Sequence, residues 1–304
     1  MRAILRDART AACVRVPRPE RPPGWVRVRV ELAGVCRTDV HAAEGRLTLG
    51  GSRILGHELV GAVEDADPRS PLPRGARVTV SPLLACGRCA GCRRHRRCAN
   101  PAMLGVHVDG AFAEQVVVPE ACVVPVPSQI SSRRAAYVEP LAAALGVVTQ
   151  APIRPDQSGI VIGAGRIADL TARVLEARGF RSLVAAREDA PPETGSLDFA
   201  IEAEGTDAAL AEALRVVAPG GVVVLKARPA GPIALDVARA VRNDVTLVGA
   251  AYGPFEDAVT LAGDLRLDDL LGDVYPLDRF AAVLEISRAR PLGPKLFLSP
   301  VEGG

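Results

Sequence analysis

Short runs of β-branched residues, separated by proline and glycine turns, fill the first 128 residues of the chain. These runs cover residues 25–33, 58–64, 77–80, 112–118 and 122–126. Regularly spaced short strands between such breakers are typical of an antiparallel, barrel-like domain. The pattern therefore predicts that the chain begins with an all-β domain.

The pattern changes after this region. Residues 131–150 are rich in alanine and leucine, follow a serine cap at Ser131 or Ser132, and are expected to form one helix kinked at Pro140. From residue 159, strand-length runs at 160–162, 183–186, 198–203, 222–226 and 246–249 alternate with predicted helices at 166–178 and 207–217. Such alternation predicts a parallel, doubly wound sheet.

The predicted sheet is shorter than a full dinucleotide-binding domain. Only residues 188–196 separate Arg187 from Leu197, where such a domain carries another helix and strand. In the strand order 3-2-1-4-5-6 the missing strand would lie at the edge, so its loss leaves the others paired. We therefore expect a truncated sheet of about five strands.

Composition narrows the class of protein. The 304 residues suffice for two separate cores, and the chain has 48% hydrophobic and 24% charged residues. No apolar run approaches the roughly 20 residues that cross a bilayer, so we expect no membrane association. The amino terminus lacks the features of a secretory signal, so we expect a cytoplasmic location. A formal net charge of +2 argues against a nucleic-acid partner.

Four of the seven cysteines, Cys86, Cys89, Cys92 and Cys98, lie within thirteen residues. Four thiolates close a tetrahedron around zinc and leave no position for a ligand, so this group predicts a structural zinc site. The five residues between Cys92 and Cys98 form a short spacer, and a reduced, cysteine-rich loop without metal is the alternative.

Three separated residues, Cys36, His57 and Glu139, predict a second and different zinc site. A thiolate, an imidazole and a carboxylate give zinc three ligands and leave a fourth position for water or a substrate oxygen. An open position of this kind indicates catalysis.

A glycine-rich turn follows the first strand of the predicted parallel sheet. Gly163, Gly165 and Ala168 occupy the three small-residue positions of a dinucleotide-binding fingerprint that joins a strand to a helix. After the second strand the chain has Arg187 where an acidic residue would bind the ribose of NAD, which favours NADP. In the alternative, Arg187 points to solvent and Glu188 reaches the ribose.

Together, and in this order, these motifs resemble the zinc-dependent medium-chain dehydrogenase/reductase superfamily, which includes alcohol, polyol and threonine dehydrogenases. Residues 109–114 and 219–224 also resemble its landmarks, so the resemblance covers nearly the whole chain. It implies an α/β plus β fold. A GroES-like antiparallel β-barrel catalytic domain would comprise residues 1–145 and 275–304, and a truncated Rossmann domain residues 146–274.

The resemblance also implies roles for individual residues. Cys36 and His57 would bind the catalytic zinc, and Glu139 stands where polyol-type members use a carboxylate, whereas Glu58 matches a glutamate that exchanges with water as a ligand. Whether Glu58 or Glu139 completes the shell stays open.

Further roles follow from the same resemblance. Thr38 and His41 match the proton relay, Asp39 would orient a ligand imidazole, and Arg37 matches an arginine that binds the cofactor pyrophosphate.

The expected function is zinc-dependent, NAD(P)-linked hydride transfer between a secondary alcohol, polyol or amino alcohol and its ketone, with one catalytic and one structural zinc. The alternative is a zinc-stabilised binding or regulatory protein that has lost cofactor turnover. Family members pair through the far sheet edge, here near residues 246–251, so a homodimer or a dimer of dimers is expected.

Overall fold

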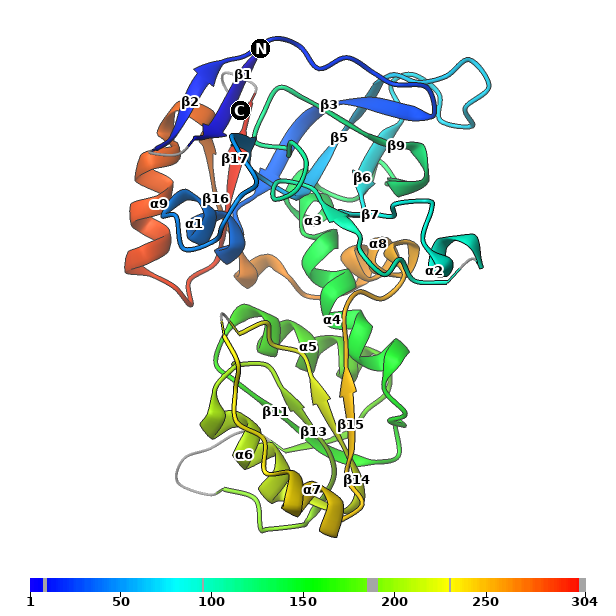
Figure 1. Cartoon of the computed structure of the whole chain (residues 1–304), viewed down its shortest axis with the longest axis vertical. Helices are drawn as coiled ribbons and strands as arrows, with labels where there is room; N and C mark the ends of the chain where they lie inside the picture. Colours follow the sequence, from blue (N-terminus) through cyan, green and yellow to red (C-terminus); the bar gives the residue numbers. More distant parts are fainter. Residues whose placement is uncertain (8–9, 95, 185–190, 230, 301–304) are drawn as a thin grey trace. The chain divides into compact units, whose positions relative to one another are not determined.

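The computed structural model describes residues 1–7, 10–94, 96–184, 191–229 and 231–300. It divides into two compact units, Met1–Glu139 with Arg266–Gly304, and Pro140–Leu265 (Figure 1). Among the described residues no helix is long and apolar enough to span a membrane.

The first unit is built on a seven-stranded sheet in the order β10-β6-β5-β3-β17-β16, with β9 also paired to β3. Its central strand, β3 (Trp25–Gly34), buries Val26, Val28 and Val30 on one face while the intervening arginines face outward. The other strands are β5 (Glu58–Asp65), β6 (Arg77–Val80), β9 (Gln115–Pro119), β10 (Val123–Pro125), β16 (Leu271–Pro276) and β17 (Lys295–Ser299). This alternation places the core of the unit against one side of β3.

One pairing in this sheet departs from the expected antiparallel arrangement. β16 and β17 run parallel, because helix α9 (Phe280–Ala289) connects them as a crossover. The connecting helix is held to the core by the Phe280 ring, which lies 5.9 Å from the ring of Phe112.

Smaller elements complete the first unit. One sheet has the order β2-β1-β4, from β1 (Arg2–Arg6), β2 (Ala11–Arg15) and β4 (Arg53–Ile54). A second pairs β7 (Leu83–Leu84) with β8 (Ala102–Met103), and the short helices are α1 (Arg37–Ala43), α2 (Ala90–Arg93) and α3 (Ser132–Ala136).

The prediction of a single kinked helix over residues 131–150 is wrong. The chain forms α3, which is capped by Ser131, and a separate helix α4 (Val138–Gln150), with the break at Tyr137. Pro140 lies in the first turn of α4, where its missing N–H group has no helical acceptor to lose, so it does not kink a helix interior.

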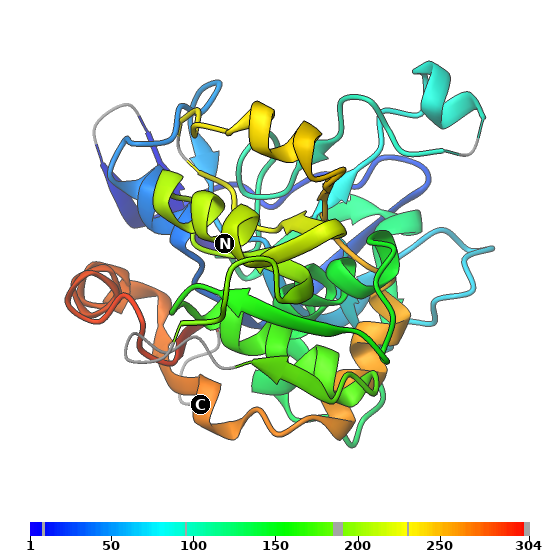
Figure 2. The ribbon, with the colours of Figure 1, turned by 90° about the horizontal axis from the view of Figure 1, so that it is seen from below.

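The second unit is a five-stranded parallel sheet in the order β12-β11-β13-β14-β15, which confirms the predicted truncation. Its strands are β11 (Ser158–Ile162), β12 (Ser182–Val184), β13 (Leu197–Glu202), β14 (Val217–Leu225) and β15 (Thr246–Gly249). The helices of this unit, seen from below in Figure 2, are α4, α5 (Arg166–Ala177), α6 (Asp207–Val216), α7 (Val237–Arg242) and α8 (Phe255–Asp264).

Each face of this sheet has its own core. Ala200 of β13 belongs to the cluster that contains Leu210 and Leu214 of α6. The adjacent Phe199 belongs to the cluster that contains Val147 of α4 and Leu175 of α5. Successive residues of β13 thus anchor helices on opposite faces, as a doubly wound sheet requires.

Lys226 follows β14 and is one of only two lysines in the chain. Its side chain is buried, and its Nζ atom donates hydrogen bonds to the carbonyl oxygens of Ala250 at 3.3 Å and Ala251 at 3.0 Å. A buried ammonium requires such partners.

Candidate metal and cofactor sites

Three side chains of the first unit form a group of potential metal donors. The ligand atoms of Cys36, His57 and Glu58 all lie within 4.8 Å of one another. Cys36 directly precedes α1, His57 directly precedes β5, and Glu58 is the first residue of β5. Gly56 allows the entry to β5, because its φ is +95° and a Cβ atom there would lie 2.5 Å from the ring of Phe112.

Asp39 connects the two segments that carry these donors. Its buried carboxylate accepts a hydrogen bond from the Cys36 backbone N–H at 2.9 Å and another from the Gly56 N–H at 3.0 Å. The same carboxylate lies 3.4 Å from Nδ1 of His57. Asp39 therefore fixes the loop positions and faces one nitrogen of the imidazole.

The charge around His57 favours a cation. Burial alone would lower the pKa of His57, but the carboxylate of Asp39 and the sulfur of Cys36 outweigh it and raise that pKa well above 6.5. An environment that favours a bound proton at the imidazole also suits a divalent metal ion, which replaces the proton.

Glu58 provides a direct test of whether a metal fits. Its side chain is 1% exposed, and Oε1 accepts a hydrogen bond from Nζ of Lys295 at 2.6 Å. The other oxygen, Oε2, is buried and has no hydrogen-bond partner among the described residues. An unpartnered carboxylate oxygen is costly in a protein interior, and a cation held with Cys36 and His57 would satisfy it. The donor set thus fits zinc.

Lys295 was not identified from the sequence. It lies at the start of β17, is 4% exposed, and its Nζ lies 5.7 Å from the centre of the Tyr137 ring. No local pattern pairs it with Glu58, which is 237 positions away in the chain. The scarcity of lysine is the one signal that could have singled it out.

Thr38 and Glu139, which were also predicted to act in catalysis, differ in their relation to the donor group. The Cys36 thiol donates to Oγ1 of Thr38 at 3.8 Å. Glu139 lies at the start of α4 and is buried, but its carboxylate is outside the donor group formed by Cys36, His57 and Glu58. Of the two candidate carboxylates, the structure places Glu58 among the donors.

His41 lies on α1, four positions after the exposed Arg37. Burial, followed by the guanidinium groups of Arg46 and Arg37, lowers its pKa below 6.5, against the opposing charge of Glu44. At neutral pH the imidazole is therefore neutral and able to accept a proton.

The second cysteine group converges in space. The sulfur atoms of Cys86, Cys89, Cys92 and Cys98 lie within 4.8 Å of one another, and all four residues are free of disulfides. Two of the separations are 3.5 Å, between Cys89 and Cys92, and 4.0 Å, between Cys86 and Cys92. Zinc–sulfur bonds of about 2.3 Å imply tetrahedral sulfur separations of about 3.8 Å, so the short spacer does not prevent closure around one ion.

Protonation in this group points to the same chemistry. Hydrogen bonds from the backbone N–H groups of Ala99 and Cys92 lower the pKa of Cys89 to about 6. The neighbouring Cys89 sulfur raises the pKa of Cys92 to about 12. Without a metal, Cys89 and Cys92 therefore do not ionise together, whereas a dication would stabilise both as thiolates.

The glycine-rich turn of the second unit has the shape of a phosphate cradle. Gly163 has a φ of +139°, and a Cβ atom there would lie 3.2 Å from the backbone of Ala203, so the turn requires glycine. Gly165 caps α5, and a Cβ atom there would meet no atom within 4 Å. Ala168 is buried on the first turn of α5. The open space beside Gly165, at a helix amino terminus, suits a pyrophosphate. Arg187 and Glu188 lie outside the described residues.

The chain is similar to known dehydrogenases. The family model "Alcohol dehydrogenase GroES-like domain" matches residues 22–128. L-galactonate-5-dehydrogenase of Escherichia coli (strain K12) is 27% identical over 294 aligned positions, which cover 85% of this chain and 86% of that protein. L-threonine 3-dehydrogenase of Pyrococcus abyssi is 28% identical over 331 aligned positions, which cover 95% of each.

Solved structures show the same fold. The alcohol dehydrogenase TADH from Thermus sp. ATN1 has a TM-score of 0.86 and 27% identity, with 98% of this chain and 99% of that chain covered. A dehydrogenase target from Sinorhizobium meliloti 1021, bound to NADP, has a TM-score of 0.88 and 24% identity, with 98% and 99% covered. Both comparisons extend over essentially the whole chain.

Proposed function

Because this chain belongs to the medium-chain dehydrogenase/reductase family and is an enzyme of the zinc alcohol and polyol dehydrogenase type, we propose that it interconverts a secondary alcohol, polyol or amino alcohol and the corresponding ketone. The oxidised alcohol gives a hydride to the nicotinamide ring of NAD(P) and a proton to the protein. The observation that carries the proposal is the group formed by the half-buried Cys36 and the buried His57 and Glu58, with one carboxylate oxygen unpartnered among the described residues.

Zinc held by this group would polarise the substrate oxygen and lower the pKa of the alcohol. The Thr38 hydroxyl lies beside Cys36 and would pass the alcohol proton onward. His41 would receive this proton, because its lowered pKa keeps it neutral at neutral pH. Asp39 would hold the His57 ring in one orientation and tautomer through Nδ1.

We propose that the chain binds two zinc ions with different tasks. The group of Cys36, His57 and Glu58 would hold the catalytic ion, with Glu58 as the exchangeable carboxylate. The four clustered cysteines would hold a structural ion, since they leave no open position. Comparison of Glu58→Gln with Glu139→Gln tests which carboxylate matters, since only loss of the true ligand should lower catalytic zinc content.

The cofactor proposal concerns two questions, whether the chain binds a nicotinamide dinucleotide and whether it prefers NADP to NAD. Gly163 and Gly165 support nicotinamide dinucleotide binding in the second unit. Preference for NADP rests on Arg187, and Arg187→Ala should therefore weaken NADPH binding more than NADH binding.

Assembly is a further part of the proposal. We expect a homodimer or a dimer of dimers formed through the sheet edge at β15, with sedimentation velocity as the test.

The decisive experiment combines metal analysis, cofactor titration and turnover on the full chain. Wild-type protein should contain bound zinc, quench or enhance nicotinamide fluorescence, and oxidise or reduce members of an alcohol and ketone panel. Cys36→Ser should lose turnover and catalytic zinc but keep cofactor binding. Cys13→Ser is the matched control, since this thiol belongs to neither cysteine group. A zinc-loaded protein that binds no cofactor and turns over no substrate would instead favour the alternative of a zinc-stabilised binding protein.

A further inference from the structure

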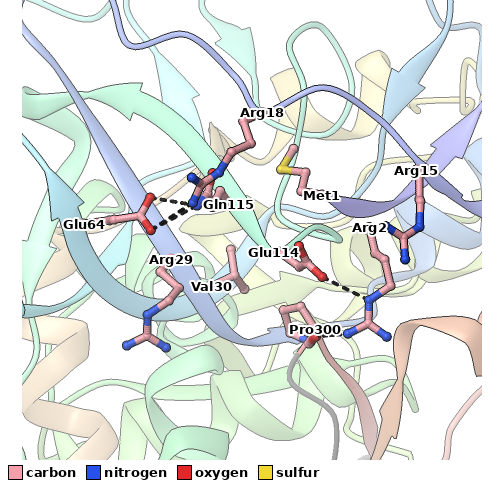
Figure 3. Close-up of a pocket in the computed structure, with 10 residues that line it drawn as sticks. All are labelled: Met1, Arg2, Arg15, Arg18, Arg29, Val30, Glu64, Glu114, Gln115 and Pro300. Atoms are coloured by element: carbon pink, nitrogen blue, oxygen red, sulfur yellow. Dashed lines mark hydrogen bonds and ion pairs between the residues drawn. The ribbon is translucent and has the colours of Figure 1, made fainter.

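A polar pocket of about 620 Å³ lies on the first unit and shares no residue with either group of metal donors (Figure 3). Its volume is typical of a small-molecule site. The charged residues that line it are four arginines and two glutamates, namely Arg2, Arg15, Arg18, Arg29, Glu64 and Glu114.

Both carboxylates of the pocket already have partners. Glu114 accepts a hydrogen bond from Nε of Arg2 at 3.0 Å, and Nη2 of Arg2 also donates to the carbonyl of Pro300 at 2.8 Å. Glu64 accepts from Nε2 of Gln115 at 2.8 Å and pairs with Arg18 at 3.4 Å. Arg2 and Arg18 thus have carboxylate partners, and neither carboxylate pairs with Arg15 or Arg29 among the described residues.

Arg15 and Arg29 are exposed, and neither guanidinium group has a hydrogen bond or ion pair with any other described residue. Arg15, at the end of β2, is directly opposite Arg2 of β1 in the antiparallel register. Like charges at opposite positions of two strands repel each other. Four guanidinium groups against two carboxylates give the lining side chains of the pocket an excess of two positive charges.

The positive charge lies at both ends of the pocket. Figure 3 shows Arg15 beside Arg2 at one end and Arg29 on the side of Glu64 and Arg18 at the other. A ligand that contacts both ends would therefore gain from an anionic group at each of its own ends.

We propose that this pocket binds an elongated organic molecule that carries one anionic group, a carboxylate or a phosphate, at each end of a neutral carbon body. Arg15 and Arg29 would each donate paired hydrogen bonds to one anionic group, as guanidinium groups do with carboxylates and phosphates. Binding would also relieve the repulsion between Arg2 and Arg15. This site is additional to the proposed dehydrogenase chemistry and does not depend on it.

Calorimetric titration of the full chain tests the proposal. The two-ended probes are adipate and a hexose bisphosphate, and the one-ended probes are acetate and the hexose monophosphate. At least one two-ended probe should bind roughly tenfold or more tightly than its one-ended counterpart, and the stronger of the two identifies carboxylate or phosphate as the preferred group.

Matched variants locate the binding. Arg15→Gln and Arg29→Gln should each weaken binding of the two-ended probe by roughly tenfold, since each removes a charged hydrogen-bond donor. Arg69→Gln with Arg74→Gln is the control, because both residues are exposed, lie outside the pocket and have no partner among the described residues. Absence of binding, equal affinity for one-ended and two-ended probes, or equal loss in the control would overturn the proposal. Unchanged melting temperatures verify that the variants fold.

Discussion

Replacement of Lys295 by methionine should destabilise the first unit far more than loss of an ordinary surface charge. Lys295 and Glu58 are 4% and 1% exposed in their side chains, with Nζ and Oε1 2.6 Å apart. At an effective dielectric constant of about 20, their Coulomb attraction is roughly 6 kcal/mol. Removal from water costs several kcal/mol for each ion, so the intact pair contributes little net stability.

Removal of one partner is different, because the carboxylate of Glu58 would remain buried without its counter-ion. We expect Lys295→Met to lower the free energy of unfolding by about 3–5 kcal/mol. The double variant with Glu58→Gln should recover most of this loss, since neither buried charge then remains.

Urea unfolding of chelator-treated protein measures the effect, so that bound metal does not compensate for the missing ammonium. Trp25 is the single tryptophan of the chain and lies on β3, so its fluorescence reports on the first unit. Asp268→Asn is a suitable control, because Asp268 pairs with Arg134 at 3.1 Å but is 80% exposed, and its loss should cost less than about 1 kcal/mol. A loss below about 1 kcal/mol for Lys295→Met, or losses that simply add in the double variant, would refute the reasoning.

Three further predictions concern the cofactor turn, the proton relay and the cysteine group. Gly163→Ala should destabilise the second unit by about 1–3 kcal/mol, because the φ of Gly163 is +139°. Gly165→Ala should keep the melting temperature and weaken NADPH binding. Equal behaviour of the two variants in thermal unfolding and fluorescence titration would contradict this prediction. Burial and two neighbouring guanidinium groups hold the pKa of His41 below 6.5, so the folded chain binds fewer protons there than the unfolded chain. Stability should therefore fall as the pH drops from 6.5 towards this lowered pKa, and His41→Gln should flatten the fall; identical pH profiles would argue against this assignment. Cys89→Ser should reduce bound zinc from about two equivalents to about one and lower the melting temperature, as measured by a colorimetric zinc assay, and an unchanged zinc content would count against a structural ion.

Regular periodicity made much of the fold predictable. The parallel sheet was anticipated strand by strand, because each buried strand is a short apolar run followed by a turn, and the run at 246–249 coincides with β15 (Thr246–Gly249). The loss of one edge strand was visible in the short spacing before Leu197. The break at Tyr137 was not visible, since proline alone does not reveal whether it starts a helix or interrupts one.

The candidate metal sites were predictable to different degrees. Cysteines close in sequence must be close in space, so the spacing of Cys86, Cys89, Cys92 and Cys98 already indicated their group. The choice between Glu58 and Glu139 depends on how β5 and α4 are placed within the fold, which no local pattern encodes. The partnership of Glu58 with Lys295 arises from tertiary packing of β17 and equally lacks a local signature.

Burial of both lysines has a practical consequence for labelling chemistry. Reagents that acylate primary amines, such as N-hydroxysuccinimide esters, find neither ε-amine on the folded surface, where arginine supplies the positive side-chain charge. Acylation at Lys295 would thus record opening of the first unit, and acylation at Lys226 would record opening of the second. Mass spectrometry of a timed reaction would then give one acylation rate for each lysine, and so a separate opening rate for each unit.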